Sequence, residues 1–196
     1  MPSRTRRSYD QFCATARALD SVGDRWALLI VRELLAGPRR YTDLHADLPG
    51  VSTDVLAARL KQMEADGLVS RRPQPRVYEL TGRGRALLPV LDALAHWGAP
   101  ELPPVPGETD AVRAHWWALP LRAALRAAVP DTTAVIDVSL PGGVFHLRLD
   151  DEAPSVYGEG PAPEGSTATL ALTPESCATL LQDRAQAEKT LRAALP

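Results

Sequence analysis

The sequence predicts a mainly α-helical N-terminal half followed by a smaller α+β half, and three patterns carry this prediction. Apolar residues recur at helical spacing through most of residues 1–97. Residues 98–108 then hold four prolines and two glycines, which no regular helix tolerates. After them, alternating apolar and polar residues indicate short strands between two helices. We therefore predict two domains, 1–97 and 109–196, joined by a semi-rigid linker.

Composition and charge bound the class of protein. Apolar residues make up 45% of the 196 residues, which is ordinary for a globular chain. The longest wholly apolar run, 26–31, is too short to cross a membrane, and no apolar segment of a secretory signal follows the N-terminal arginines. We therefore expect a cytoplasmic protein without a membrane partner. Its two cysteines are too few for a disulfide framework.

The net charge of −2 is unevenly distributed. Residues 1–97 carry 15 Arg and Lys against 11 Asp and Glu, a net +4, whereas residues 98–196 carry 7 against 13, a net −6. A basic half can lie on phosphates while an acidic half stays away from them.

The first helices are predicted at 9–20 and at 25–36, where Asp24 serves as the cap and Gly37-Pro38 ends the helix. The second is apolar on two sides and should be central and buried. A long helix is predicted from Thr81 to about Trp97. Its apolar stripe exceeds what one small core needs, so we expect part of it to face a second subunit. The stripe consists of Ala86, Leu87, Val90, Leu91, Leu94 and Trp97.

Residues 39–81 form the most informative segment. A short helix at 41–48, a tight turn at 49–51 and a second helix at 52–66 precede two short strands at 68–72 and 76–80. Helix, turn, helix and β-hairpin is the order of a winged helix-turn-helix. In that fold the second helix enters the major groove of DNA and the hairpin touches the flanking backbone.

The second helix has an inward and an outward face. Leu56, Leu60 and Met63 share the inward face, and Ser52 is a good N-cap. On the outward face, small Ala57 and Ala58 allow close approach to base edges, while Asp54 must avoid phosphates or accept from a cytosine amine. Arginines on both flanks, Arg71 included, suit phosphate contacts. The predicted DNA-binding residues are Arg39, Arg40, Ser52, Thr53, Asp54, Ala57, Ala58, Arg59, Lys61, Arg72 and Arg76. The alternative is that these charges are only a solvated surface.

The second half alternates differently. A helix is predicted at 111–129, strands at 132–140, 144–149, 155–158 and 167–172, and a helix at 174–181. This order suggests an α+β domain.

From about Cys13 to Trp97 the chain closely resembles the HxlR-type family of winged-helix regulators. The matching segments are Cys13, 18–20, 22–26, 28–30, 32–41, 43–44, 48–52, 55–56, 59–60, 67–69, 78–81 and Gly84. The resemblance implies a homodimer that binds a roughly palindromic operator in double-stranded DNA, usually as a repressor. Two departures are Ala14, where the family commonly has Pro, and a short hairpin tip at 73–75.

The second half resembles, more weakly, the sterol-carrier-protein-2-like fold. This resemblance rests on Trp116-Trp117, the helix to Val129, and the segments 143–148 and 171–174. It implies an apolar cavity for lipid-like ligands, and thus a small hydrophobic effector. The sequence pattern lacks the last strand and helix of that fold.

Cys13 is a candidate redox sensor. In some relatives of the HxlR type the matching cysteine senses oxidants or electrophiles, and Arg17, four residues on, could stabilise a thiolate. The alternative is a buried, small apolar residue at a helix start. Cys177 is expected to pack a helix face. No histidine has metal-ligand spacing, and no phosphate loop or catalytic motif appears, so we expect no metal, no cofactor and no enzyme activity.

These patterns and resemblances together predict a sequence-specific DNA-binding transcriptional regulator, a homodimeric repressor controlled by a small apolar effector or by thiol modification. The alternative is a protein that binds lipids or other hydrophobic ligands and whose N-terminal half is mainly a dimerisation scaffold.

Overall fold

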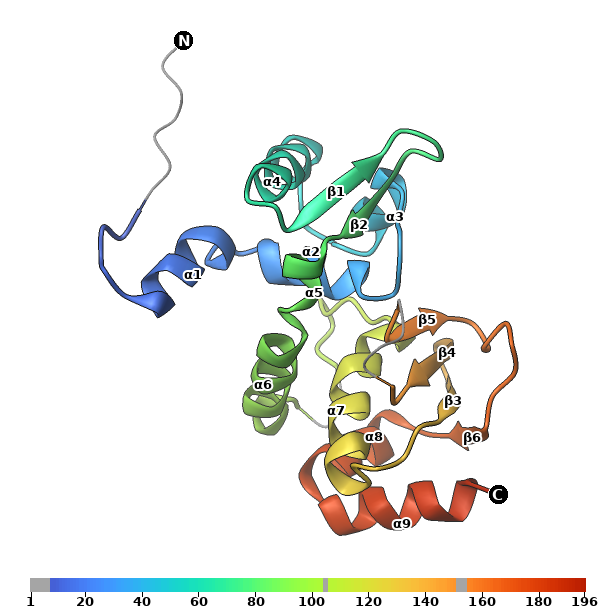
Figure 1. Cartoon of the computed structure of the whole chain (residues 1–196). Coiled ribbons are helices and arrows are strands. Elements are labelled where there is room, and N and C mark those ends of the chain that lie inside the picture. The colour runs from blue at the N-terminus through green and yellow to red at the C-terminus, as the bar shows by residue number, and fades with distance from the viewer. Residues whose placement is uncertain (1–7, 104–105, 151–154) are drawn as a thin grey trace. The chain divides into compact units, whose positions relative to one another are not determined.

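The computed structural model describes residues 8–103, 106–150 and 155–196, and the chain divides into two compact units (Figure 1). The first unit comprises the residues up to Leu34 together with Pro38–Arg85. The second comprises Leu35–Gly37 and Ala86–Pro196.

The first unit has the predicted order of helix, turn, helix and hairpin (Figure 1). Its elements are α1 Ala14–Val22, α2 Ala27–Leu34, α3 Tyr41–Ala46, α4 Thr53–Ala65, β1 Val69–Arg72, β2 Val77–Leu80 and α5 Gly82–Arg85. The prediction of a winged helix-turn-helix is therefore confirmed for this unit. The first helix begins at Ala14, five residues later than predicted.

Helix α2 is central to this unit, as its two apolar sides predicted. Ala27, Ile30 and Val31 are fully buried, and the inward face of α4 packs into the same core. The fully buried core residues from the other elements are Leu44, Leu56 and Met63. Burying side chains of this size contributes about 1.5–3 kcal/mol each relative to exposure, so this core fixes the orientation of α4.

The β-hairpin of β1 and β2, called the wing below, is an antiparallel pair in which Val69 faces Leu80 and Arg72 faces Val77. A third stretch of backbone joins it, because Arg39 and Tyr78 exchange two backbone hydrogen bonds of 2.9 and 2.7 Å. The wing is therefore attached to Arg39, which lies two residues before the start of α3.

The prediction of one long helix from Thr81 is wrong. The chain forms α5, then two turn residues, and then α6 at Leu88–Gly98. Pro89 lies in the first turn of α6. Proline is tolerated there because backbone N–H groups of the first turn have no partner within the helix, whereas in a helix interior its missing N–H breaks a hydrogen bond. Proline also disfavours helical geometry in the residue before it. A helix from Thr81 running through Pro89 would place this proline in its interior.

The second unit contains a four-stranded sheet in the order β5-β4-β3-β6 with helices packed against it (Figure 1). The strands are β3 Val135–Leu140, β4 Gly143–Arg148, β5 Tyr157–Glu159 and β6 Ala168–Ala171. Neighbouring strands are antiparallel except β3 and β6, which are parallel. The helices are α6, η1 Ala99–Glu101, η2 Ala114–Trp117, α7 Ala118–Ala128, α8 Pro174–Gln182 and α9 Arg184–Ala194.

Two features of this unit differ from the sequence prediction. Helix α6 packs against α7 and groups with the second unit, whereas we placed residues 86–97 in the first domain. Helix α9 was not predicted, because it is mostly polar and buries only Ala187 and Leu191. The α+β character that we predicted is present. Within the described residues, no helix is long and apolar enough to cross a membrane.

Candidate nucleic-acid interface

Helix α4 presents one exposed face, as its sequence predicted. The hydroxyl oxygen of Ser52 accepts a hydrogen bond of 3.3 Å from the Val55 amide and so caps the helix. Leu56, Leu60 and Met63 are buried. The predicted DNA-binding residues Thr53, Asp54, Ala57, Ala58 and Lys61 are all exposed. This is the face that a winged helix-turn-helix turns towards bases.

A turn and one side chain of α3 position the start of α4 relative to α3. Gly50 has a φ of 87°, a left-handed conformation that glycine adopts without strain, and it turns the chain between the two helices. The Tyr41 hydroxyl donates a hydrogen bond of 2.8 Å to the backbone carbonyl of Thr53. The first turn of α4 is therefore tied directly to the start of α3.

Three of the predicted basic residues are exposed without an ion-pair partner in the described part of the chain: Arg40, Lys61 and Arg76. Arg40 precedes α3, Lys61 lies on α4, and Arg76 lies at the tip of the wing. Cations placed in this way on three elements are available for phosphate groups.

Two other predicted arginines, Arg39 and Arg59, form ion pairs within the protein. Arg39 pairs with Asp47 at 3.5 Å, and both side chains are largely buried. Arg59 forms a short ion pair and hydrogen bond with Asp24, a contact between residues 35 positions apart that the sequence pattern did not reveal. The structure therefore gives Arg39 and Arg59 roles in holding the unit together.

Arg72 pairs with Glu79 across the wing, with 2.5 Å between its Nη2 and the Glu79 Oε2. The hydrogen bond from this guanidinium lowers the pKa of the Glu79 carboxyl and raises the pKa of Arg72. The Arg72 side chain is nevertheless 55% exposed, so one side of it can still face a ligand.

The tip of the wing forms a pocket lined by Arg71, Pro73, Gln74, Pro75 and Arg76. The Arg71 guanidinium lies 5.7 Å from the centre of the Tyr78 ring, within the range of a cation–π contact. Arg76, the other arginine of the tip, makes no such ring contact within the described residues.

Cys13 is exposed and occupies the N-cap position of α1. The backbone amides of Ala16 and Thr15 lower the pKa of its thiol. Arg17, which we expected to stabilise a thiolate, instead pairs with Asp20 at 3.6 Å. The alternative of a buried apolar role is therefore wrong for Cys13. A buried apolar role fits Cys177, because burial raises the pKa of its thiol to about 12.

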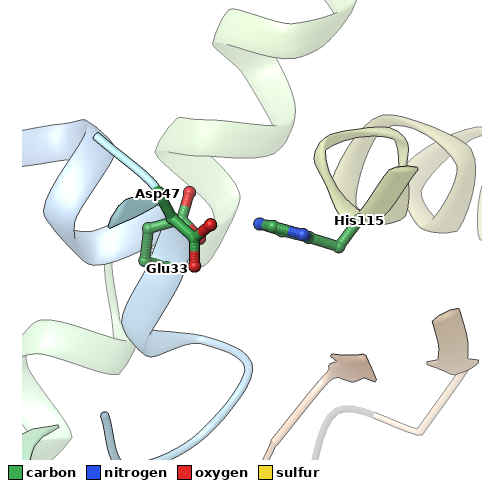
Figure 2. A group of neighbouring side chains, drawn as sticks. All are labelled: Glu33, Asp47 and His115. Carbon is green, nitrogen blue, oxygen red and sulfur yellow. The ribbon is translucent and has the colours of Figure 1, made fainter. Parts of the chain in front are cut away.

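Two carboxylates lie close together at the ends of α2 and α3. Glu33, at the end of α2, and Asp47, directly after α3, offer oxygens within 4.8 Å of each other (Figure 2). Glu33 is fully buried and accepts a hydrogen bond of 2.7 Å from Arg32. With Arg39 on Asp47, two guanidiniums balance the two carboxylates. The Arg39–Asp47 pair connects the end of α3 to Arg39, whose backbone bonds Tyr78 of the wing. No sequence pattern indicated a role for Glu33.

In the second unit, α7 covers the sheet with an apolar face. Leu121 and Leu125 are fully buried, as are Phe145 and Leu147 on β4. Arg122 is also buried, and its Nε donates a hydrogen bond of 2.7 Å to the backbone carbonyl of Arg148. His115, also drawn in Figure 2, stacks on Tyr157 with ring centres 6.2 Å apart.

Comparison with known proteins finds similarity over the N-terminal half of the chain. A family model described as HxlR-like helix-turn-helix matches residues 21–105. An uncharacterized HTH-type transcriptional regulator of Bacillus subtilis, YvaP, is 38% identical over 93 residues, which cover 45% of this chain and 86% of that protein. Another, sll1512 of Synechocystis, is 38% identical over 92 residues, which cover 44% of this chain and 68% of that protein. The crystal structure of quinone-bound YodB from B. subtilis is similar at 33% identity, covering 46% of this chain and 99% of that chain, with a TM-score of 0.42.

Proposed function

The chain belongs to the HxlR-like helix-turn-helix family through its N-terminal half, and on this premise we propose that it is a sequence-specific DNA-binding regulator of transcription. The observation that carries the proposal is the outer face of α4. This face is exposed, capped and built of short side chains, and unpaired cations stand on three elements of the same unit.

Each exposed residue has a role that its chemistry suits. The methyl groups of Ala57 and Ala58 can contact thymine, and Asp54 can accept from a cytosine amine. Ser52 and Thr53 lie at the helix N-terminus, where backbone amides and hydroxyls bind phosphate. The basic residues that position the duplex are Arg40, Lys61, Arg72 and Arg76. Arg39 and Arg59 contribute indirectly, through their ion pairs with Asp47 and Asp24 inside the first unit.

We propose that the protein binds as a homodimer to a roughly palindromic operator. Support comes from α6, where Val90, Leu94 and Trp97 share one side and are 43%, 44% and 78% exposed. An apolar stripe of this size is costly in water and is well suited to a second copy. Two recognition helices in successive major grooves would then lie about 10 base pairs apart.

Control of DNA binding is assigned to two features. The exposed Cys13 thiol, with its lowered pKa, suits oxidation or alkylation. The second feature is the α+β unit, which we propose is a sterol-carrier-like module that takes a small hydrophobic effector; its four-stranded sheet with α7 packed on it is the basis for this comparison. Either event would act by favouring a dimer whose recognition helices have the wrong spacing, and repression would end when the operator is released.

The test is enrichment of random duplexes on the purified full chain, followed by salt titration of the best fragment. A palindrome with steep salt dependence is the expected result. The variant Lys61→Ala should weaken binding, while Lys189→Ala, an exposed lysine of the second unit, serves as the control. Weak retention of all fragments, from protein that carries lipid, would instead support the hydrophobic-ligand protein with an N-terminal scaffold.

A further inference from the structure

Asp24 lies between α1 and α2, and its carboxylate makes two different contacts. One oxygen, Oδ1, accepts a hydrogen bond of 3.1 Å from the Trp26 amide and so caps the start of α2. The other, Oδ2, pairs with Nη2 of Arg59 on α4. A residue that the sequence identified only as a helix cap therefore also holds the helix that faces DNA.

Trp26 adds a second point of contact at the same place. Its ring packs beside Gly50 in the turn before α4, at 3.9 Å from where a Cβ on that glycine would lie. The Arg25 guanidinium lies 5.2 Å from the centre of this ring. The start of α2 thus contacts both the turn that leads into α4 and the middle of α4 itself. Two contact points fix how far α4 is rotated about its own axis.

The ion pair also determines where the Arg59 charge points. Arg59 directly follows Ala58 of the exposed face, and its side chain remains 24% exposed. Its Nε is buried without a hydrogen-bond partner among the described residues, so Asp24 is the partner that orients this guanidinium. Released from Asp24, the side chain would be long enough to turn towards solvent and take a phosphate of any sequence.

We propose that Asp24 is a specificity-determining positioning residue for DNA recognition. By holding Arg59 against the protein, it fixes the rotation of α4 and withholds a cation that would otherwise strengthen binding to every duplex. This inference rests on the proposed DNA-binding function. According to it, the Asp24 carboxylate sets the ratio of affinity for the specific duplex to affinity for non-specific DNA.

The test uses the full chain and two probes: a duplex of about 30 base pairs selected by the wild type from a random library, and a scrambled duplex of the same composition. The variants are Asp24→Asn, Arg59→Gln and the double variant. Affinities are measured between about 50 and 200 mM KCl. Asparagine retains an oxygen that can cap α2, so the variant removes the charge and leaves the cap.

We expect Asp24→Asn to bind the scrambled duplex about three- to tenfold more tightly, with a salt slope steeper by about one, because one more phosphate is contacted. The ratio of specific to non-specific affinity should fall about tenfold. In the double variant the gain on the scrambled duplex should disappear, since the released cation is gone. A purely structural role of Asp24 would not produce this reversal.

Three results would overturn the inference. One is an Asp24→Asn variant with an unchanged ratio and an unchanged slope, and another is an equal loss of affinity for both duplexes in the single and double variants. A wild type that itself prefers no sequence would overturn the proposed function as well, which separates the two failures. If Asp24→Asn does not fold, Asp24→Ser, which also keeps a capping oxygen, decides between the same outcomes.

Discussion

The hydroxyl of Tyr41 reaches the backbone carbonyl of Thr53 at 2.8 Å and links the two helices of the helix-turn-helix. Thr53 is the first residue of α4, so this bond acts where the helix begins. Desolvation of the phenol, followed by the charges of Tyr78 and Asp54, raises the pKa of Tyr41. The phenol therefore stays protonated and remains a donor well above neutral pH.

Replacing Tyr41 by phenylalanine should lower the free energy of unfolding by about 1 kcal/mol, the usual net value of one hydrogen bond. DNA binding should weaken as well, since the first turn of α4 loses its tie to α3. Tyr9→Phe is the matched control, because the Tyr9 hydroxyl makes no hydrogen bond within the described residues. Chemical denaturation measures the difference. Equal stability of the two variants would contradict the assignment.

Two glycines of α5 offer a sharper comparison. A Cβ on Gly84 would lie 2.1 Å from the Leu68 carbonyl oxygen, whereas a Cβ on Gly82 would meet nothing within 4 Å. Gly84→Ala should therefore destabilise the first unit by about 1–3 kcal/mol or more, because backbone must move. Gly82→Ala should be neutral or stabilise by up to about 1 kcal/mol. Thermal unfolding of both variants checks this, and a similar Tm for the two would contradict the close approach at Gly84.

The sequence was sufficient for those features that depend on local patterns. The cap at Ser52, the turn at Gly50 and the inward face of α4 follow from short-range chemistry, and the structure has all three. The four strands of the second unit were also predicted close to their observed bounds, since alternation of apolar residues is a local signal.

Contacts between distant parts of the chain could not be predicted from local patterns. Nothing near Arg59 in the sequence indicates that its guanidinium has a partner 35 residues earlier. The same holds for Arg39, which pairs with Asp47. The break before α6 is different, because Pro89 is a local signal for it, but the apolar stripe continues through this proline and predicts one long helix.

The wing provides a test of which arginines bind phosphate. Arg76 has no ion-pair partner in the described chain, whereas Arg72 is held by Glu79. Arg76→Ala should reduce the salt slope of DNA binding by about one and leave sequence preference unchanged. Arg72→Ala should reduce the slope less, because this cation is already paired. Binding titrations at several salt concentrations measure both slopes, and a larger effect at Arg72 would contradict the role given to Arg76.

The two cysteines should differ strongly in their reaction with alkylating reagents. Amides at the start of α1 lower the pKa of the exposed Cys13 thiol below its usual 9.0, while burial raises that of Cys177 to about 12. Since the thiolate is the reactive form, Cys13 should react faster than free cysteine at neutral pH, and its rate should level off at a lower pH. Rates measured by mass spectrometry against pH, with Cys13→Ser as the control, test this. A midpoint at or above that of free cysteine would remove the basis for thiol control of this protein.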